Sequence, residues 1–224
     1  MLDAIGETLP LAVAIALSPL AIASVVLMLL SSRPRAASIA FLLGFSVAVA
    51  VVSAAGFLLA SVLPHGDDDS SISAPFILLA LGIIAIALAV RQWRTRPEPG
   101  AELELPGWIA KVESITTPSA FVLGAFFGGL KPKNLLLSIG LGVTLEATGV
   151  SGGDAAVVLG IAVLIAASPL LVPVIIALIA LTRISAGLDR LRDWMVRNNS
   201  SLVGAILLLV GVLLIGKALS GLGG

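Results

Sequence analysis

Long apolar runs dominate this chain, and short charged or glycine- and proline-rich segments separate them. The runs fall at about residues 7–31, 37–63, 75–93, 118–145, 155–182 and 201–219. Each run approaches or exceeds the roughly 20 apolar residues that a helix needs to cross a bilayer. The pattern therefore predicts an all-α, polytopic membrane protein with six transmembrane helices and no separate soluble domain.

Composition agrees with a membrane protein, because 58% of the 224 residues are hydrophobic and only 12% are charged. The formal net charge is zero, so no excess of basic residues indicates nucleic acid as a partner. The chain has no cysteine, which excludes disulfides, thiolate metal sites and thiol redox chemistry. The first apolar run follows acids, Asp3 and Glu7, where a signal peptide would carry basic residues. We therefore expect a transmembrane helix there rather than a cleaved leader.

The basic residues of the connections are confined to every second connection along the chain. The first, third and fifth connections carry the basic residues Arg33, Arg35, Arg91, Arg94, Arg96, Lys111, Arg183, Arg190, Arg192 and Arg197. The charges of the second and fourth connections are Asp67, Asp68, Asp69, Glu146 and Asp154. The positive-inside rule then assigns the odd connections to the cytoplasm. It predicts a multi-pass protein of the plasma membrane with both termini extracytoplasmic.

Lys131 and Lys133 flank a proline in the middle of the fourth apolar run, where they are the only charges. The flanking stretches Ser119–Leu130 and Asn134–Leu145 have 12 residues each, too few to cross a bilayer alone. We therefore expect both ammonium groups near mid-depth. Each costs about 2.5–3.5 kcal/mol there on insertion scales and needs an anionic partner or a watery cavity. The alternative is a short helix that begins after Lys133 and leaves both lysines at the cytoplasmic interface.

The first and fourth runs each have a proline near their centre. Pro19 follows Ala-Leu-Ser, and Pro132 follows Gly-Leu-Lys. Proline removes an amide donor and clashes with the preceding turn, so each proline is expected to start a new half-helix. With three helices in each half, the pattern predicts two inverted repeats, 1–94 and 118–224, joined by a cytoplasmic or interfacial connection, 95–117. The alternative is that the prolines only kink helices for packing.

The interrupted helices predict a binding site at mid-membrane. Half-helix amino ends carry partial positive charge and bind anions, and the two lysines add full charges. The fifth run also has a Ser-Pro pair and a second proline near its centre, so a helix break or hinge is expected there as well. The candidate substrate-binding residues are Ser18, Lys131, Lys133, Asn134 and Ser168, and the candidate helix breaks or hinges are Pro19, Pro132, Pro169 and Pro173.

The residues inside the predicted helices favour an anionic substrate over other chemistry. No aspartate, glutamate, histidine or arginine lies in the interior of a predicted helix, because the acids Asp3, Glu7, Glu146 and Asp154 are near helix ends. A phosphate, sulfate or carboxylate is therefore the expected partner of the lysines. Hard divalent metals need clustered carboxylates or imidazoles, so neither a metal site nor a cofactor is expected. No carboxylate pair, thiol or histidine base lies where a substrate would sit, so we do not expect an enzyme. The spacing of Ile184, Leu188, Leu191 and Met195 predicts a short amphipathic helix on the cytoplasmic face.

Three segments carry a resemblance to a known family: SPLAIASVVLMLLSSRPRAASIAFLLGF, LKPKNLLLSIG and DRLRDWMVRNNSSLVGAILLLVGVLLIGKAL. Together they resemble the actinobacterial glycopeptidolipid- and sulfolipid-addressing proteins of the lysine-exporter superfamily. The resemblance covers nearly the whole chain, and the proline motifs and Trp194–Asn199 are its most specific parts. It implies a six-helix exporter-like fold and a role in moving cell-envelope glycolipids across the plasma membrane. The family motif usually reads Asn-Pro-Lys-Asn, and Lys131 replaces its first asparagine.

These observations favour an exporter that moves an anionic or amphiphilic cell-envelope component, such as a glycolipid or lipid precursor, through the mid-membrane site. Its expected partners are membrane lipids and an anionic lipid or small anionic substrate. One alternative is a membrane scaffold that assists an envelope-lipid export machinery without transporting anything itself. Another is an exporter of a small anionic metabolite. A homo-oligomer is compatible with each of these hypotheses, and nucleic acid with none.

Overall fold

The computed structural model describes residues 1–29, 34–62, 73–95, 115–180 and 185–222. Over these ranges the chain is helical and has no strand, so the all-α prediction is confirmed for them. The elements are α1 (Leu2–Ala16), α2 (Pro19–Leu29), α3 (Pro34–Ser61), α4 (Ser73–Arg94), α5 (Thr117–Ala125), the π-helix η2 (Phe126–Leu130), α6 (Pro132–Ala147), α7 (Gly152–Ala180) and α8 (Ser185–Leu222).

Several helices are long and apolar enough to cross a membrane, which agrees with a multi-pass protein. Four pass this test alone in the described ranges: α3, α4, Gly152–Ile175 of α7 and Arg197–Leu222 of α8. The consecutive helices α1 and α2 meet at a bend of 53° and pass as one broken span, which gives up to five. The apolar run 118–145 is divided into shorter pieces, α5 with η2 and then α6. The count of six spans therefore stays a prediction.

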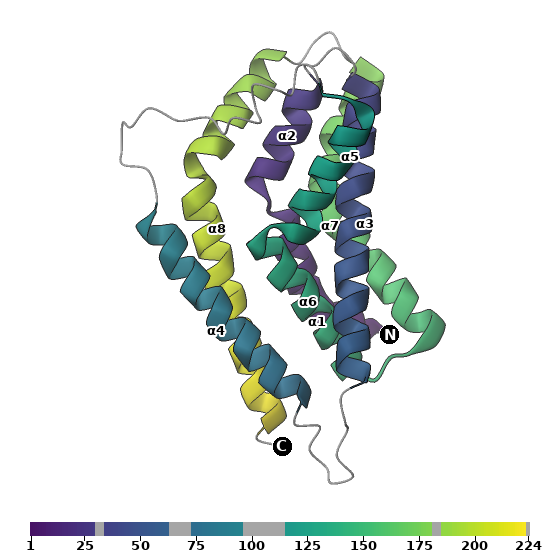
Figure 1. The fold of residues 1–224 in the computed structure, drawn as a ribbon, viewed down its shortest axis with the longest axis vertical. Helices are drawn as coiled ribbons and strands as arrows, with labels where there is room; N and C mark the ends of the chain where they lie inside the picture. Colours follow the sequence, from purple (N-terminus) through teal and green to yellow (C-terminus); the bar gives the residue numbers. More distant parts are fainter. Residues whose placement is uncertain (30–33, 63–72, 96–114, 181–184, 223–224) are drawn as a thin grey trace.

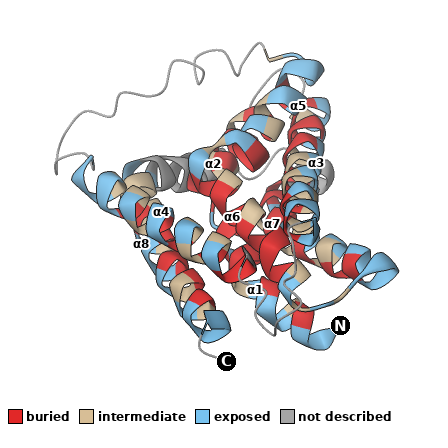
Figure 2. Ribbon diagram, turned by 60° about the horizontal axis from the view of Figure 1, so that its bottom comes forward, coloured by how far each residue is buried: buried red, intermediate tan, exposed pale blue. Residues whose placement is uncertain are grey.

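The helices form two groups that meet around α6 and α2. α4 and α8 pack along each other, while α3 packs along α5, η2 and α6, and α7 packs against α1 and α3. Figure 2 shows the buried residues concentrated where α1, α3, α6 and α7 come together. Phe41 and Phe45 of α3, Leu137 and Leu141 of α6 and Ile15 of α1 are among the largest side chains there with essentially no exposed surface. The core thus lies where α1 and α6, which are pieces of the two broken runs, pack against α3 and α7.

Two local expectations differ from the structure. α7 continues as one helix through Pro169 and Pro173, so the breaks predicted at these two prolines do not occur. Membrane helices tolerate an internal proline when neighbouring groups satisfy the freed carbonyls. The predicted amphipathic helix is not a separate element, because Ser185–Leu222 is one helix that runs into the last span; Ile184 lies outside the described residues.

α3 approaches the α5–η2–α6 run so closely that glycine is needed where the backbones cross. A β-carbon at Gly124 would overlap the carbonyl oxygen of Phe41, and one at Gly142 would overlap that of Ser53. Small residues at such crossings let membrane helices gain van der Waals contact along their backbones. Because Phe41 and Ser53 are 12 positions apart on α3, this contact holds both pieces of the broken run along one straight helix.

This close crossing gives a prediction about stability. Gly124→Ala should lower the melting temperature of the detergent-solubilised protein. The overlap with backbone costs about 1–3 kcal/mol, more than the roughly 0.5–1 kcal/mol that alanine gains over glycine in a helix. Gly160→Ala is the matched control, because no atom lies within 4 Å of a β-carbon there, and it should melt at or above the parent temperature. A Gly124→Ala protein as stable as the Gly160→Ala protein would contradict the described crossing.

Candidate functional site

The two helix interruptions lie side by side in the middle of the bundle. α1 ends at Ala16 and α2 begins at Pro19, and η2 ends at Leu130 before α6 begins at Pro132. A β-carbon on Gly129 would contact Ala48 and Val52, which lie in the central part of the spanning helix α3. The second interruption is therefore at mid-length of a spanning helix, as expected for Lys131 and Lys133. The short helix α6 begins between the two lysines, at Pro132, but α5 and η2 continue the apolar run on the other side of both lysines. The depth of the lysines in the membrane stays a prediction.

The first interruption follows from proline chemistry. Pro19 has no amide hydrogen, so the carbonyl of Ile15 loses its helical donor, and the Ser18 hydroxyl donates to that carbonyl at 2.7 Å instead. The Ser18 amide turns to the Ala16 carbonyl at 2.8 Å, so the helical partner of the Ala14 carbonyl is lost as well. The Ala21 amide donates to the Ser18 carbonyl, which leaves Leu17 without its usual donor. The carbonyls of Ala14 and Leu17 therefore need donors from elsewhere.

Lys133 supplies both missing donors from the other half of the chain. Its Nζ donates to the Ala14 carbonyl at 2.7 Å and to the Leu17 carbonyl at 3.2 Å, and the residue is only 8% exposed. These carbonyls lie at the carboxyl end of α1, where the helix dipole presents partial negative charge to a cation. The partner of Lys133 in this structure is therefore a pair of backbone carbonyls in place of the expected anion.

The second interruption is satisfied in a similar way. The Lys131 amide donates to the Phe126 carbonyl at 2.9 Å, a π-type bond, and Pro132 has no amide to offer. The side-chain amide of Asn134 donates to the Phe127 carbonyl at 2.8 Å, which replaces a lost helical donor. Asn134 is 1% exposed, so this bond is made in a site without bulk water.

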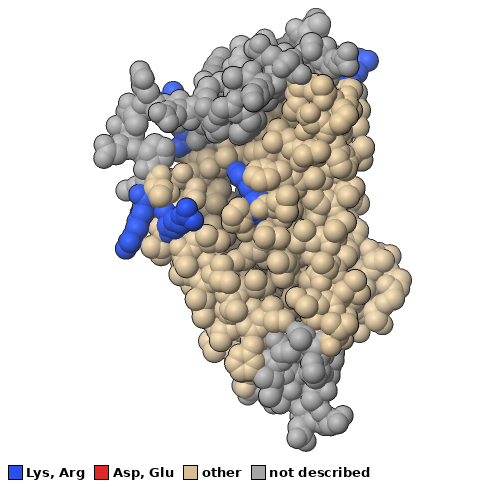
Figure 3. Space-filling view, viewed as in Figure 1, with Lys and Arg blue, Asp and Glu red and all other residues tan. Residues whose placement is uncertain are grey.

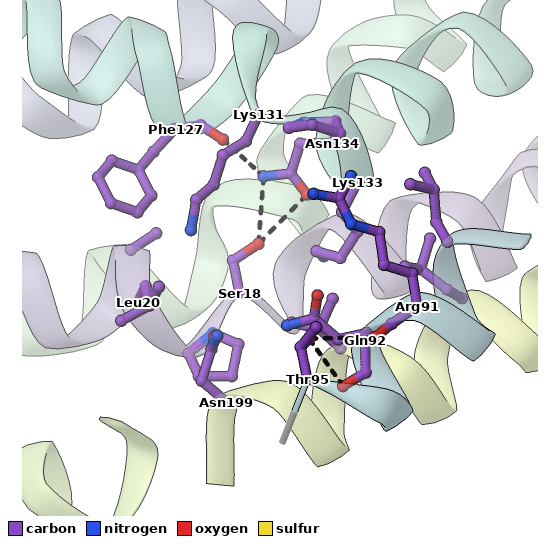
Figure 4. A pocket seen from close by; sticks show the side chains of 16 residues that line it. Ser18, Leu20, Arg91, Gln92, Thr95, Phe127, Lys131, Lys133, Asn134 and Asn199 are labelled. Carbon is purple, nitrogen blue, oxygen red and sulfur yellow. Dashed lines mark hydrogen bonds between the residues drawn. The ribbon is translucent and has the colours of Figure 1, made fainter. Parts of the chain in front are cut away.

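A further hydrogen bond, between side chains, joins the two interruptions. The Asn134 Nδ2 lies 3.2 Å from the Ser18 Oγ, and Figure 4 shows the two side chains pointing toward each other. Because the Ser18 hydroxyl already donates to Ile15, the consistent assignment has Asn134 as donor and Ser18 as acceptor. Both amide hydrogens of Asn134 are then used. Ser18, Lys133 and Asn134 accordingly hold the two broken helices together.

A cavity of about 470 Å³ lies beside the interruptions, with its wall formed by α2, α4, α8 and the η2–α6 junction. The first turns of both half-helices, Pro19–Ala21 and Pro132–Asn134, line it. Its other polar residues are Ser18, Arg91, Gln92, Thr95, Lys131 and Asn199, and its other apolar residues are Leu88, Phe127, Val203 and Leu207. Figure 3 shows basic side chains in the upper part of this face, next to a hollow.

The cavity is lined by cations and by no acid among the described residues. Lys131 is partly exposed, and its Nζ lies 4.5 Å from the centroid of the Phe127 ring, within reach of a cation–π contact. Arg91 comes from the opposite wall, on the last turn of α4. No ion pair to Lys131 or Arg91 is found in the described ranges. The only described pair joins Lys217 of α8 to Glu7 of α1, and neither of these residues lines the cavity.

The structure brings together most of the residues that the sequence singled out. Ser18, Pro19, Lys131, Pro132, Lys133 and Asn134 all line the cavity. Ser168, Pro169 and Pro173 do not line it; Ser168 is exposed and its hydroxyl donates to the Ile165 carbonyl at 2.8 Å.

The pattern did not single out Arg91, Gln92, Thr95 or Asn199, which also line the cavity. A sequence signal existed for one of them. Arg91 lies inside the third apolar run, 75–93, although it was grouped with the basic connection that follows.

The fold and the site define a multi-pass helical membrane protein with two adjoining interrupted helices and a cation-lined cavity. Within this class, the family model described as "Sap, sulfolipid-1-addressing protein" matches residues 8–220, so the chain belongs to that family. Family membership links the protein to sulfolipid addressing at a membrane. Neither a curated protein nor a solved structure matches the chain.

The different environments of the two lysines predict different stabilities for matched substitutions. Replacing either lysine by methionine removes one ammonium group, but only Lys133→Met leaves two buried carbonyls without donors. The Lys133→Met protein should therefore be less stable than the Lys131→Met protein by about 1–3 kcal/mol. Reversible denaturant unfolding in detergent micelles measures the difference. Equal stabilities, or a less stable Lys131→Met protein, would show that the bonds to Ala14 and Leu17 are not formed.

Proposed function

We propose that this protein is an exporter of an anionic or amphiphilic cell-envelope component, such as a glycolipid or lipid precursor, and that the cargo binds in the cavity. The observation that carries the proposal is the cavity's charge. Three cationic side chains and the amino ends of two half-helices face a space that no described acid lines. Positive charge that no neighbouring acid balances favours an anionic guest.

The lining also has an apolar part, which suits an amphiphile. Leu20, Leu88, Val203 and Leu207 line the same cavity as the polar groups. A volume of about 470 Å³ accommodates a headgroup rather than a whole glycolipid. The cargo's charged part would sit near the interruptions, and its hydrocarbon part would extend along the apolar lining or into the bilayer.

We further propose six membrane crossings arranged as two inverted repeats, 1–94 and 118–224. The packing supports this arrangement. α3 packs against both pieces of the second broken run, and α7 packs against both pieces of the first, α1 and α2. Likewise α4 packs against α6 and α8, while α8 packs against α2 and α4. Exchanging the halves therefore reproduces these contacts, as in transporters that move one repeat against the other, although the contact of α1 with α6 has no comparable counterpart between α5 and α2.

The proposed orientation determines from which side of the membrane the cargo reaches the cavity. α4 ends and α5 begins toward the end of the bundle at which the basic connections begin. Both chain termini lie toward the opposite end. The positive-inside rule assigns the basic end to the cytoplasm of a plasma membrane and the termini to the outside. Because Arg91, Gln92 and Thr95 at the end of α4 line the cavity, cargo would enter from the cytoplasmic half.

Transport activity is preferred here to enzymatic activity or a purely structural role. In the cavity that the structure describes, no carboxylate or imidazole is present to act as a general base. A structural scaffold has no need of cations on a cavity wall inside a membrane, because such groups are costly. An exporter of a small anionic metabolite uses the same cations, so the experiment below includes small anions.

Reconstitution of the purified protein in liposomes tests the proposal. We expect translocation of a fluorescent anionic lipid across the bilayer, and a reduction of its initial rate by at least about 10-fold in the Lys131→Ala protein. A contact between a charged donor and a charged acceptor contributes about 1.5–3 kcal/mol, and 1.4 kcal/mol corresponds to a factor of ten.

The control for this assay is Lys217→Ala, which removes a lysine that does not line the cavity and should transport at nearly the parent rate. Movement of small anions without movement of lipid would replace the proposed cargo by a metabolite. If no probe moves, and cells carrying Lys131→Ala keep the envelope composition of the parent, the protein is a scaffold and not an exporter.

A further inference from the structure

We infer that Arg91 and Lys131 form a two-sided clamp for the acidic headgroup of a lipid, which enters the cavity sideways from the surrounding leaflet. Nothing in the family match assigns a role to Arg91. The inference rests on the proposed function, since it names the binding residues and the type of cargo for the same cavity.

The first step is that the cavity's other strong donors are already occupied. Two of the three Lys133 ammonium hydrogens are donated to the carbonyls of Ala14 and Leu17, Lys133 is only 8% exposed, and both amide hydrogens of Asn134 are used within the protein. A ligand that displaced these bonds would release backbone carbonyls in a low-dielectric site, which is costly. Lys133 and Asn134 are therefore positioning residues, and the cations left for a ligand are Arg91 and Lys131.

The second step is that these two cations come from separate parts of the bundle. Arg91 is on the last turn of α4, which packs mainly along α8, and Lys131 is the extended residue between η2 and α6. Figure 4 shows Arg91 reaching from α4 into the cavity, whose other wall carries Lys131. Arg91 is exposed and Lys131 is partly exposed, so water screens the repulsion between them, and an anion placed between the two cations would be attracted by both. An anion that contacts both would draw α4 toward the η2–α6 junction.

The third step concerns the way in. The hollow in Figure 3 lies on the flank of the bundle, in the region between the upper end of α4 and the η2–α6 junction in the matching view of Figure 1. Apolar residues near this junction face outward: Leu130 is 65% exposed and Phe126 is 45% exposed. An opening on the flank of a membrane helix bundle faces lipid. A ligand that enters there needs a hydrocarbon part that can stay in the leaflet, which a small hydrophilic anion lacks.

The fourth step is the chemistry of the headgroup. The arginine guanidinium binds two oxygens of a phosphate, sulfate or carboxylate in a planar, bidentate geometry. The lysine ammonium acts as a compact point charge, which suits a third oxygen of the same group or a remaining lone pair on one of the two oxygens. The clamp therefore fits any singly or doubly charged oxyanion attached to a lipid, and it does not require a specific sugar or chain.

Lipid binding, measured without transport, tests this inference. The probe is a phosphatidic acid with a fluorescent acyl chain, titrated into the purified full-length protein in micelles of a zwitterionic detergent. R91Q and K131Q should each raise the Kd about 10–100-fold, because a hydrogen bond to a charged group contributes about 1.5–3 kcal/mol. R94Q is the matched control, since Arg94 is exposed on the same helix and does not line the cavity, and it should bind like the parent. Melting curves confirm that each variant is folded.

Competition separates the two sources of an oxyanion. Excess inorganic phosphate should displace the fluorescent lipid only weakly, and unlabelled phosphatidic acid should displace it fully. Equal competition by inorganic phosphate would overturn sideways lipid entry in favour of a small-anion site. Parent-like binding by R91Q and K131Q, or an equal loss in R94Q, would overturn the clamp. If R91Q and K131Q weaken lipid binding as expected but the parent protein moves no lipid in liposomes, the clamp stands and only the exporter proposal is rejected.

Discussion

The fold depends on the requirement that every backbone carbonyl inside a membrane has a donor. A proline in the middle of a spanning helix violates this requirement, because it removes a donor and opens the helix. Lys133, from the other half of the chain, supplies the missing donors, because its one ammonium is shared by the carbonyls of Ala14 and Leu17. The charge that is costly in hydrocarbon and the carbonyls that are costly without donors therefore compensate each other. Together with the hydrogen bond from Asn134 to Ser18, this contact joins the two halves of the chain at their centre.

Once that contact is made, the polar cavity follows from geometry. Each half-helix must begin again after its proline, so the first turns of α2 and α6 both face the same region. Their unpaired amides and partial positive charge cannot point into lipid. A polar space next to the interruptions gives them water or a ligand, and Lys131 and Arg91 add full charges to it. The architecture thus makes an anion-attracting site from groups needed to stabilise the break.

Much of this arrangement was predictable from local chemistry. The spacing of charges in the fourth apolar run indicated buried lysines, and the paired prolines indicated two interruptions at equal depth. What the pattern missed was the partner of Lys133. The expected partners were a carboxylate or an external anion, whereas the observed partners are carbonyls that lose their helical donors at the interruption around Pro19. Arg91 was missed for a different reason: whether a residue near a helix end faces a cavity depends on tertiary packing, here of α4 against α8. Pro169 and Pro173 show the converse, because proline alone does not decide whether a membrane helix breaks.

The difference between the two lysines has a consequence for how specificity can vary. Lys133 stabilises the first interruption, so its replacement alters the scaffold whatever the cargo is. Lys131 lies over Phe127 and lines the open side of the cavity, so its replacement changes the charge offered to a ligand while the backbone bonds at both breaks remain. In the proposed exporter, a substitution at the position before Pro132 would therefore change the preference for a headgroup without removing these backbone bonds. In this chain that position carries a full positive charge, which matches an anionic lipid better than an uncharged one.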